Sequence, residues 1–242
     1  MLLILDLDGV LIDSEEPGLR VEMEVLRALG CRFSAAEYVE AALGRTDEEN
    51  LWEEVAAASG IALPPGFPNR MREAVAAALR RELRPVPGAR QLLEWLRERR
   101  ISYCLASGSR PERLRRNLEW VGLAPFFDEN VFSGLEVERG KPEPFLFLEA
   151  AARMRAAPED CLVIEDSPAG VTAARRAGME VWGFAGAGHF RLYPRLRERL
   201  VEAGAALLFE SLAALPGLLE RTRWLKFLSH GKSPASDKEV SR

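Results

Sequence analysis

The chain has 242 residues, of which 48% are hydrophobic, and its 33 basic and 37 acidic side chains give a net charge of −4. This much apolar material can form one large domain or a domain that carries an insertion. The charge is spread along the chain without a basic block, which argues against binding to nucleic acid through its phosphates. No apolar run reaches the roughly 18 residues of a membrane helix, so we expect a soluble, cytoplasmic protein with no membrane partner.

Six short apolar runs predict the strands of a parallel α/β sheet, and amphipathic helices lie between most of them. The expected strands cover residues 2–7, 101–106, 131–133, 162–164, 181–184 and 206–209. Helical patterns over 88–100, 111–122 and 168–178 begin at Pro or Gly, and the last two stop at Gly. We therefore expect a Rossmann-like core, in which ligands gather at the carboxyl ends of the strands.

Residues 14–84 interrupt this alternation, because they contain helical stretches and no strand candidate. We interpret this segment as a small all-helical cap domain inserted into an α/β core formed by residues 1–13 and 85–220. The expected cap helices cover 17–29, 35–43, 47–59 and 67–83. Residues 221–242 hold three of the four lysines and carry a net charge of +4, and we expect them to form a disordered basic tail.

The three cysteines, Cys31, Cys104 and Cys161, lie far apart in the sequence. They have neither the number nor the spacing of a disulfide framework or of a zinc site. We expect them to pack in the apolar core, where a free cysteine behaves as a small hydrophobic residue.

Acidic residues follow two of the predicted strands. Asp6 and Asp8, with Gly9 behind them, end the first strand, and Glu165 and Asp166 end the fourth. Neighbouring parallel strands bring such ends within about 5–10 Å, where carboxylates can share one Mg²⁺ ion. Taken singly, each pair also fits a solvated turn, and Asp166 also fits a helix N-cap before a proline.

A hydroxyl and an ammonium complete this set of polar groups. Ser107 and Gly108 follow the second predicted strand at a helix start, where backbone N–H groups can hold a phosphate oxygen. Lys141 is the only lysine among the first 225 residues, in a chain that has 29 arginines. A lone lysine is usually a surface charge, but a compact ammonium differs from the planar fork of arginine, so we expect Lys141 to have a chemical role.

Four segments occur in a recognisable order: DLDGVLIDSE from residue 6, the turn at Ser107, GKPEP around Lys141, and EDSPAG from Glu165. They resemble the four motifs of the haloacid dehalogenase-like hydrolase superfamily. More narrowly, the chain is similar to the branch of phosphatases and β-phosphoglucomutase-like enzymes with a helical cap inserted after the first motif. The resemblance covers about residues 1–220, and it is specific for fold and chemistry but not for substrate.

The resemblance implies a phosphoryl transfer in which Asp6 attacks phosphorus and forms an aspartyl-phosphate. Asp8 would act as general acid and base, and we expect crowding by Asp6 and Asp166 to raise its pKa. Mg²⁺ would bind Asp6, the main-chain oxygen of Asp8 and Asp166, with Glu165 close behind. The phosphate and substrate would contact the set Gly9, Ser107, Gly108 and Lys141.

The implied substrate is a small phosphorylated metabolite, either a sugar phosphate or a phosphorylated organic acid. We expect the protein to be a monomer or a weak dimer. In the cap, Gly44 and Arg45 are expected to face the substrate. The loop that ends at His189 resembles a loop of some phosphatases, and its histidine fits either a surface turn or a site contact.

Four alternatives to a phosphatase can be weighed on the sequence. A dehalogenase is not expected to have Asp8, and a phosphonate-cleaving enzyme uses a cap lysine, which residues 14–84 lack. A non-catalytic binding module is expected to lose a motif acid, and none is lost. A β-phosphoglucomutase-like phosphomutase stays open, although the residues expected of it are replaced here by Gly18, Asp47 and Arg110-Pro111.

Overall fold

The computed structural model describes residues 1–42, 48–222 and 224, and in these residues six parallel strands form one sheet in the order β3-β2-β1-β4-β5-β6. Their bounds are β1 Leu2–Leu5, β2 Ser102–Ser107, β3 Val131–Ser133, β4 Cys161–Glu165, β5 Glu180–Phe184 and β6 Leu207–Phe209. The α/β fold expected from the sequence is confirmed. β1 ends at Leu5, two residues before the end expected at residue 7. The Leu7 carbonyl accepts the N–H groups of Leu11 and Ile12 in a turn, instead of a hydrogen bond from a neighbouring strand.

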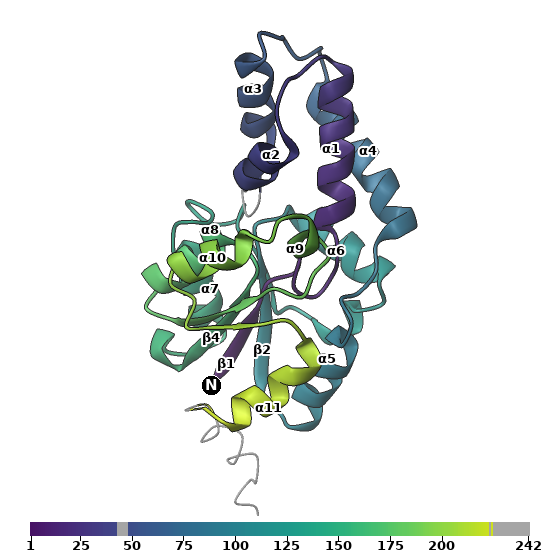
Figure 1. The fold of residues 1–242 in the computed structure, drawn as a ribbon. Coiled ribbons are helices and arrows are strands. Elements are labelled where there is room, and N and C mark those ends of the chain that lie inside the picture. The colour runs from purple at the N-terminus through teal and green to yellow at the C-terminus, as the bar shows by residue number, and fades with distance from the viewer. Residues whose placement is uncertain (43–47, 223, 225–242) are drawn as a thin grey trace, which may run out of the picture.

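Helices cover both faces of the sheet, which explains why the four residues of β1 are each no more than 1% exposed. Figure 1 shows α7, α8 and α10 on one side of the sheet and α5, α6 and α11 on the other. Their bounds are α5 Ala89–Glu98, α6 Pro111–Trp120, α7 Phe145–Arg153, α8 Pro168–Arg176, α10 Leu196–Glu202 and α11 Leu215–Glu220, and the short α9 spans His189–Leu192.

Four helices occupy the inserted segment and stand over the carboxyl ends of the strands (Figure 1). They are α1 Glu15–Ala28, α2 Ala35–Ala42, α3 Glu48–Ala58 and α4 Phe67–Glu82. Within the described part of residues 14–84 there is no strand, as expected for a helical cap. α1 and α4 pack side by side. The inserted helices therefore stand, together, above the carboxyl ends of the strands, which is where ligands bind in open α/β sheets.

The packed core reaches further along the chain than residue 220. Trp224 is fully buried, and its indole N–H donates to the Glu180 carboxylate at 3.2 Å, so the expected tail does not begin at 221. Residues 225–242 lie outside the described residues. All three cysteines are buried and free, which confirms their expected place in the core. None of the described helices has the length and apolarity needed to cross a membrane.

Candidate active site

The sheet order places Asp6 between the ends of two other strands. β1 pairs with β2 on one side and with β4 on the other. The Asp6 N–H donates to the Ile164 carbonyl at 3.1 Å, so Asp6 continues the ladder by one residue. Its side chain therefore lies level with Ala106 and Glu165. The reversal of strand order at β1 is where open α/β sheets bind their ligands.

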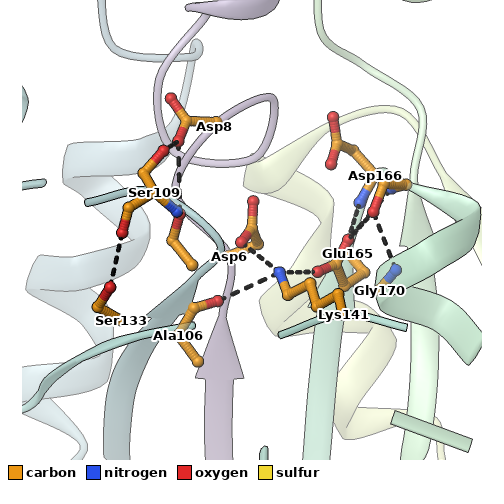
Figure 2. Close-up of polar contacts among 11 residues, drawn as sticks. Asp6, Asp8, Ala106, Ser109, Ser133, Lys141, Glu165, Asp166 and Gly170 are labelled. Carbon is orange, nitrogen blue, oxygen red and sulfur yellow. Dashed lines mark hydrogen bonds and ion pairs between the residues drawn. The ribbon is translucent and has the colours of Figure 1, made fainter. Parts of the chain in front are cut away.

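Lys141 forms hydrogen bonds to residues at the ends of β1, β2 and β4. Its ammonium, with a side chain only 3% exposed, donates to Asp6 Oδ1 at 2.7 Å, to the Ala106 carbonyl at 3.4 Å and to Glu165 Oε1 (Figure 2). Burial alone would lower the pKa of Lys141, but the carboxylates of Asp6 and Glu165 raise it above its usual range. The alternative of a solvated surface charge is therefore wrong at this lysine, which is a buried, protonated cation among the strand ends.

Glu165 is held from both ends of its carboxylate. While Oε1 accepts from Lys141, Oε2 accepts the N–H groups of Asp166 and Ser167 at 3.1 Å and the Ser167 hydroxyl at 2.9 Å. Ser167, and not Asp166, caps α8 by accepting the Gly170 N–H at 3.0 Å. The alternative of Asp166 as a helix cap is wrong, and the Asp166 carboxylate stays available for the site.

Gly170 is required by the closeness of α8 to Glu165. A Cβ at Gly170 would lie 2.0 Å from the carboxylate of Glu165, which its four partners prevent from moving away. In a helix interior, alanine is more stabilising than glycine by roughly 1 kcal/mol. An extra methyl group forced into a well-packed core destabilises the protein by about 1–3 kcal/mol. We expect Gly170→Ala to lower the free energy of unfolding by about 1–2 kcal/mol in urea denaturation. Gly217→Ala in α11, where nothing lies within 4 Å, should leave it unchanged or raise it, and equal effects would contradict this account.

Asp8 lies apart from the other three acids and turns towards β2 (Figure 2). Its oxygens accept hydrogen bonds from the Ser14 hydroxyl at 2.6 Å and the Ser109 hydroxyl at 2.7 Å, and Arg113 Nη2 lies at 3.4 Å. Burial raises the pKa of Asp8, but Arg113 and the two hydroxyls outweigh it and hold this pKa below its usual range. The expectation that neighbouring acids raise it is wrong in this arrangement.

Asp6, Glu165 and Asp166 form a compact group of acidic oxygens that lie within 4.8 Å of one another. Burial, together with the charges of the neighbouring acids, raises the pKa of Asp6 and of Asp166 well above its usual range. Oδ2 of Asp166 is buried without a hydrogen-bond partner. A divalent cation would reduce the charge repulsion among these carboxylates and would give Asp166 Oδ2 a partner. The carboxylate oxygens of this group therefore fit a hard, oxygen-seeking ion such as Mg²⁺.

Gly9 and His189 pack against Asp166 from two sides. Gly9 has φ +74°, and a Cβ there would lie 1.8 Å from Asp166 Oδ2, so only glycine lets the chain pass this carboxylate. His189 is fully buried, with Nε2 3.2 Å from the same oxygen but without hydrogen-bond geometry. Burial lowers the pKa of His189. The surface histidine considered from the sequence is wrong, and His189 is a site contact.

A cavity of about 80 Å³ lies above these groups and receives residues from both the core and the cap. Asp6, Asp8, Ser107, Gly108 and Lys141 line it, whereas Gly9 is not among the lining residues and lies against Asp166. Ser107 is 1% exposed, with its hydroxyl 3.4 Å from Asp8 Oδ2. Gly44 and Arg45 lie outside the described residues.

Sequence reasoning missed the groups that surround Asp8 and the acids that α1 adds to the cavity. Ser14, Glu15 and Glu22 line it from the insertion, and Ser109 and Arg113 line it from the core. Burial, and then the charges of Asp8 and Asp166, raise the pKa of Glu15 to about 8. The signal available in the sequence was proximity to motifs, since Ser14 and Glu15 end DLDGVLIDSE and Ser109 follows Ser107 by two residues.

The chain is similar to known proteins over most of its length. The family model described as haloacid dehalogenase-like hydrolase matches residues 1–178. A phosphorylated carbohydrates phosphatase of Thermotoga maritima is 30% identical over 73% of this chain and 81% of its own. The 6-phosphogluconate phosphatase of Escherichia coli is 26% identical over 90% of this chain and 94% of its own.

Solved structures agree with these sequence matches. A haloacid dehalogenase-like protein of unknown function from Agrobacterium tumefaciens is 34% identical, with a TM-score of 0.78 over 90% of this chain and 96% of that one. A Thermotoga maritima protein solved as a proposed β-phosphoglucomutase is 28% identical, with a TM-score of 0.70 over 91% of this chain and 99% of that one.

Proposed function

Because this chain belongs to the haloacid dehalogenase-like hydrolases, we propose that it is a Mg²⁺-dependent phosphatase of small phosphomonoesters. The substrate would be a sugar phosphate or a phosphorylated organic acid, hydrolysed through an aspartyl-phosphate. The observation that carries this proposal is Asp6, a buried carboxylate at the floor of a cavity, with one oxygen held by Lys141 at 2.7 Å. The alternative of a non-catalytic binding module finds no support in a site that retains every motif group.

In the proposed first step, the free oxygen of Asp6 attacks phosphorus and the bond from phosphorus to the substrate oxygen breaks. Lys141 fixes Oδ1, and Oδ2 accepts no hydrogen bond from any described residue, so Oδ2 is the oxygen available for attack. The ammonium also offsets negative charge where the phosphoryl group gathers it. Water then attacks the aspartyl-phosphate, releases phosphate and restores Asp6.

Asp8 would handle the protons of both steps. The leaving oxygen takes a proton from Asp8, and Asp8 takes one back from the attacking water. The contacts of Asp8 with Arg113, Ser14 and Ser109 favour its carboxylate form, which supports the role of base. Action as an acid requires the carboxyl group to leave Arg113 and gain a proton as substrate enters.

The acidic group at the end of β1 and β4 would hold the Mg²⁺ ion. Asp6, Asp166 and the main-chain oxygen of Asp8 are the proposed ligands, because the carboxylate of Glu165 is occupied by Lys141 and the start of α8. When bound, the ion supplies positive charge that lowers the repulsion between the nucleophile and the phosphate. Ser107, Gly108 and Lys141 would bind the remaining phosphate oxygens from the other side of the cavity.

A β-phosphoglucomutase-like activity is the second candidate, supported by the similarity to the proposed mutase structure from Thermotoga maritima. The cavity argues against it. Gly18, where the family resemblance leads us to expect a histidine in a mutase, lines the cavity and brings no imidazole to it. Arg110 and Pro111 stand where Lys-Asn is expected at the start of α6.

The two candidates give different products from one incubation. With β-glucose 1-phosphate, Mg²⁺ and a bisphosphate primer, we expect free phosphate to form at least tenfold faster than glucose 6-phosphate. The physical reason is that water, rather than a second substrate hydroxyl, takes the phosphoryl group from Asp6 in the absence of the mutase residues. The measurement is coupled detection of both products, and faster formation of glucose 6-phosphate would overturn the choice of a phosphatase.

A further inference from the structure

His189 is a buried side chain that the proposed reaction leaves unused. It is fully buried, and neither Nδ1 nor Nε2 has a hydrogen-bond partner among the described residues. A buried donor or acceptor without a partner destabilises a protein by about 1–3 kcal/mol. An apolar side chain could fill the same space without this penalty, so packing alone gives no reason for an imidazole here.

One of the two unpaired nitrogens faces the unpaired oxygen of Asp166. His189 Nε2 lies 3.2 Å from Asp166 Oδ2, which is the distance of a hydrogen bond, and only the direction of the ring falls short. The last side-chain torsions of aspartate and histidine are broad, so a small rotation of either group can align an N–H with the oxygen. The ring can present an N–H at Nε2 in its neutral and in its protonated form.

The backbone on both sides of His189 holds the ring in this place. The Gly188 N–H donates to Asp13 Oδ1 at 3.2 Å, and the Tyr193 N–H donates to the His189 carbonyl at 3.0 Å. The Phe190 ring packs on the imidazole, with the two ring centroids 4.4 Å apart. A side chain can fix another one only when it is itself held, and this condition is met here.

Gly9 encloses the same oxygen from another side. A Cβ at Gly9 would lie 1.8 Å from Asp166 Oδ2 and 3.0 Å from His189 Cε1, so the main chain passes against both groups. The Gly9 N–H already donates to the Ile12 carbonyl at 2.8 Å. Of these two neighbours, the imidazole is therefore the one with an N–H to offer to Asp166.

We propose that His189 is a positioning residue that donates from Nε2 to Asp166 Oδ2 and so fixes this carboxylate for the metal ion. The proposal rests on the Mg²⁺ site of the proposed function, in which Asp166 is a ligand. A carboxylate oxygen has two acceptor positions, so Oδ2 can accept this bond and contact the ion as well. Outer partners of this kind orient metal ligands, and their loss typically lowers metal affinity 10–100-fold.

Binding of Mg²⁺ in the absence of substrate tests this role. We expect His189→Leu, which has no donor, to raise the dissociation constant for Mg²⁺ at least about tenfold in calorimetric titration. The amide nitrogen of glutamine takes roughly the place of Nε2 and that of asparagine the place of Nδ1. His189→Gln should therefore stay within about threefold of the parent, whereas His189→Asn should bind as weakly as His189→Leu. Equal affinity of the parent and His189→Leu would overturn the proposal.

Phe190→Leu is the matched control for lost packing, because Phe190 is buried beside His189 and does not line the reaction cavity. It should keep the Mg²⁺ affinity within about twofold. Without metal, the urea midpoint of His189→Leu should be no lower than that of the parent, since two unpaired nitrogens are removed. Equal losses of affinity in the two variants would reduce His189 to a packing role and overturn the proposal. Should His189→Leu fail to fold, His189→Phe makes the same test with a ring that has no donor.

A second metal ion distinguishes a positioning residue from a ligand. Imidazole is a better ligand for Mn²⁺ than for Mg²⁺. We expect His189→Leu to weaken both ions by the same factor, with free Mn²⁺ counted by electron paramagnetic resonance. A loss for Mn²⁺ that exceeds the loss for Mg²⁺ at least about tenfold would make His189 a ligand of the ion and overturn the positioning role.

Turnover separates failure of this proposal from failure of the phosphatase function. For His189→Leu, the Mg²⁺ concentration that gives half-maximal hydrolysis of p-nitrophenyl phosphate should rise at least about tenfold, while kcat at saturating Mg²⁺ stays within about threefold. No hydrolysis by the parent would overturn the phosphatase function, and the binding titrations would still decide the role of His189. No binding of Mg²⁺ by the parent would overturn the metal site and the role of His189 with it.

Discussion

Replacing Asp6 by asparagine is expected to abolish Mg²⁺-dependent release of phosphate from p-nitrophenyl phosphate, with a loss of at least about a thousandfold in kcat. The amide keeps the shape of the side chain and an oxygen that can accept from Lys141, but it is a poor nucleophile. Steady-state kinetics measure the loss, and trapping of an acyl phosphate from rapidly quenched enzyme should succeed for the parent and fail for the variant.

Two controls separate lost chemistry from lost structure in this variant. The pKa of Asp6 is raised by burial and by the neighbouring acids, so its ionised form is costly in the folded protein. Asp6→Asn removes that charge, and we expect its urea midpoint to be no lower than that of the parent. Asp128→Asn, at an exposed position, should keep parental activity. Turnover by Asp6→Asn above about one hundredth of the parent would refute the nucleophile assignment.

Lys141→Arg is expected to be nearly inactive, with a loss of about a hundredfold or more, although it keeps the positive charge. The three acceptors around the ammonium belong to Asp6, Ala106 and Glu165, and together they fit three donors on one small cation. A guanidinium is planar and larger, and at a site only 3% exposed it cannot make these bonds without moving Asp6 or Glu165. The measurement is kcat with p-nitrophenyl phosphate.

The converse substitution two residues away is the control for Lys141→Arg. Arg139→Lys exchanges the same two residue types at an exposed position and should leave kcat unchanged. We also expect Lys141→Arg to lower the urea midpoint, since the buried carboxylates lose their fitted partner. A fall in kcat of less than about tenfold would show that charge alone suffices at Lys141.

The sequence predicted the core of the fold well because local patterns determine it. Short apolar runs become buried parallel strands, and the bounds of the helices that were predicted differ from the observed ones by at most two residues at either end. The early end of β1 was not predicted, since Leu7 is as apolar as the strand before it and only its turn hydrogen bonds remove it from the ladder. The burial of Trp224 was missed because a basic, lysine-containing segment gave no sign of one packed aromatic residue.

Part of the site was likewise predicted from the sequence, and part of it only the structure shows. Asp6, Lys141, Glu165 and Asp166 were predicted, because strand ends and the order of motifs suffice to bring them to one edge of a sheet. The partners of Asp8 were not, and the expected direction of its pKa shift was therefore wrong. Arg113 lies 105 residues along the chain from Asp8, and no local pattern specifies that contact.

By itself, therefore, the sequence determined the α/β core, the inserted helices and the phosphoryl-transfer chemistry, since these depend on periodicity and on residue types at strand ends. Only the tertiary structure decided which way Asp8 turns, that His189 is buried against Asp166, and that α1 adds Glu15 and Glu22 to the cavity above Asp6. The physical reason is that charge and hydrogen-bond environments are set by side chains far apart in the sequence that packing brings together, as it brings Arg113 to Asp8.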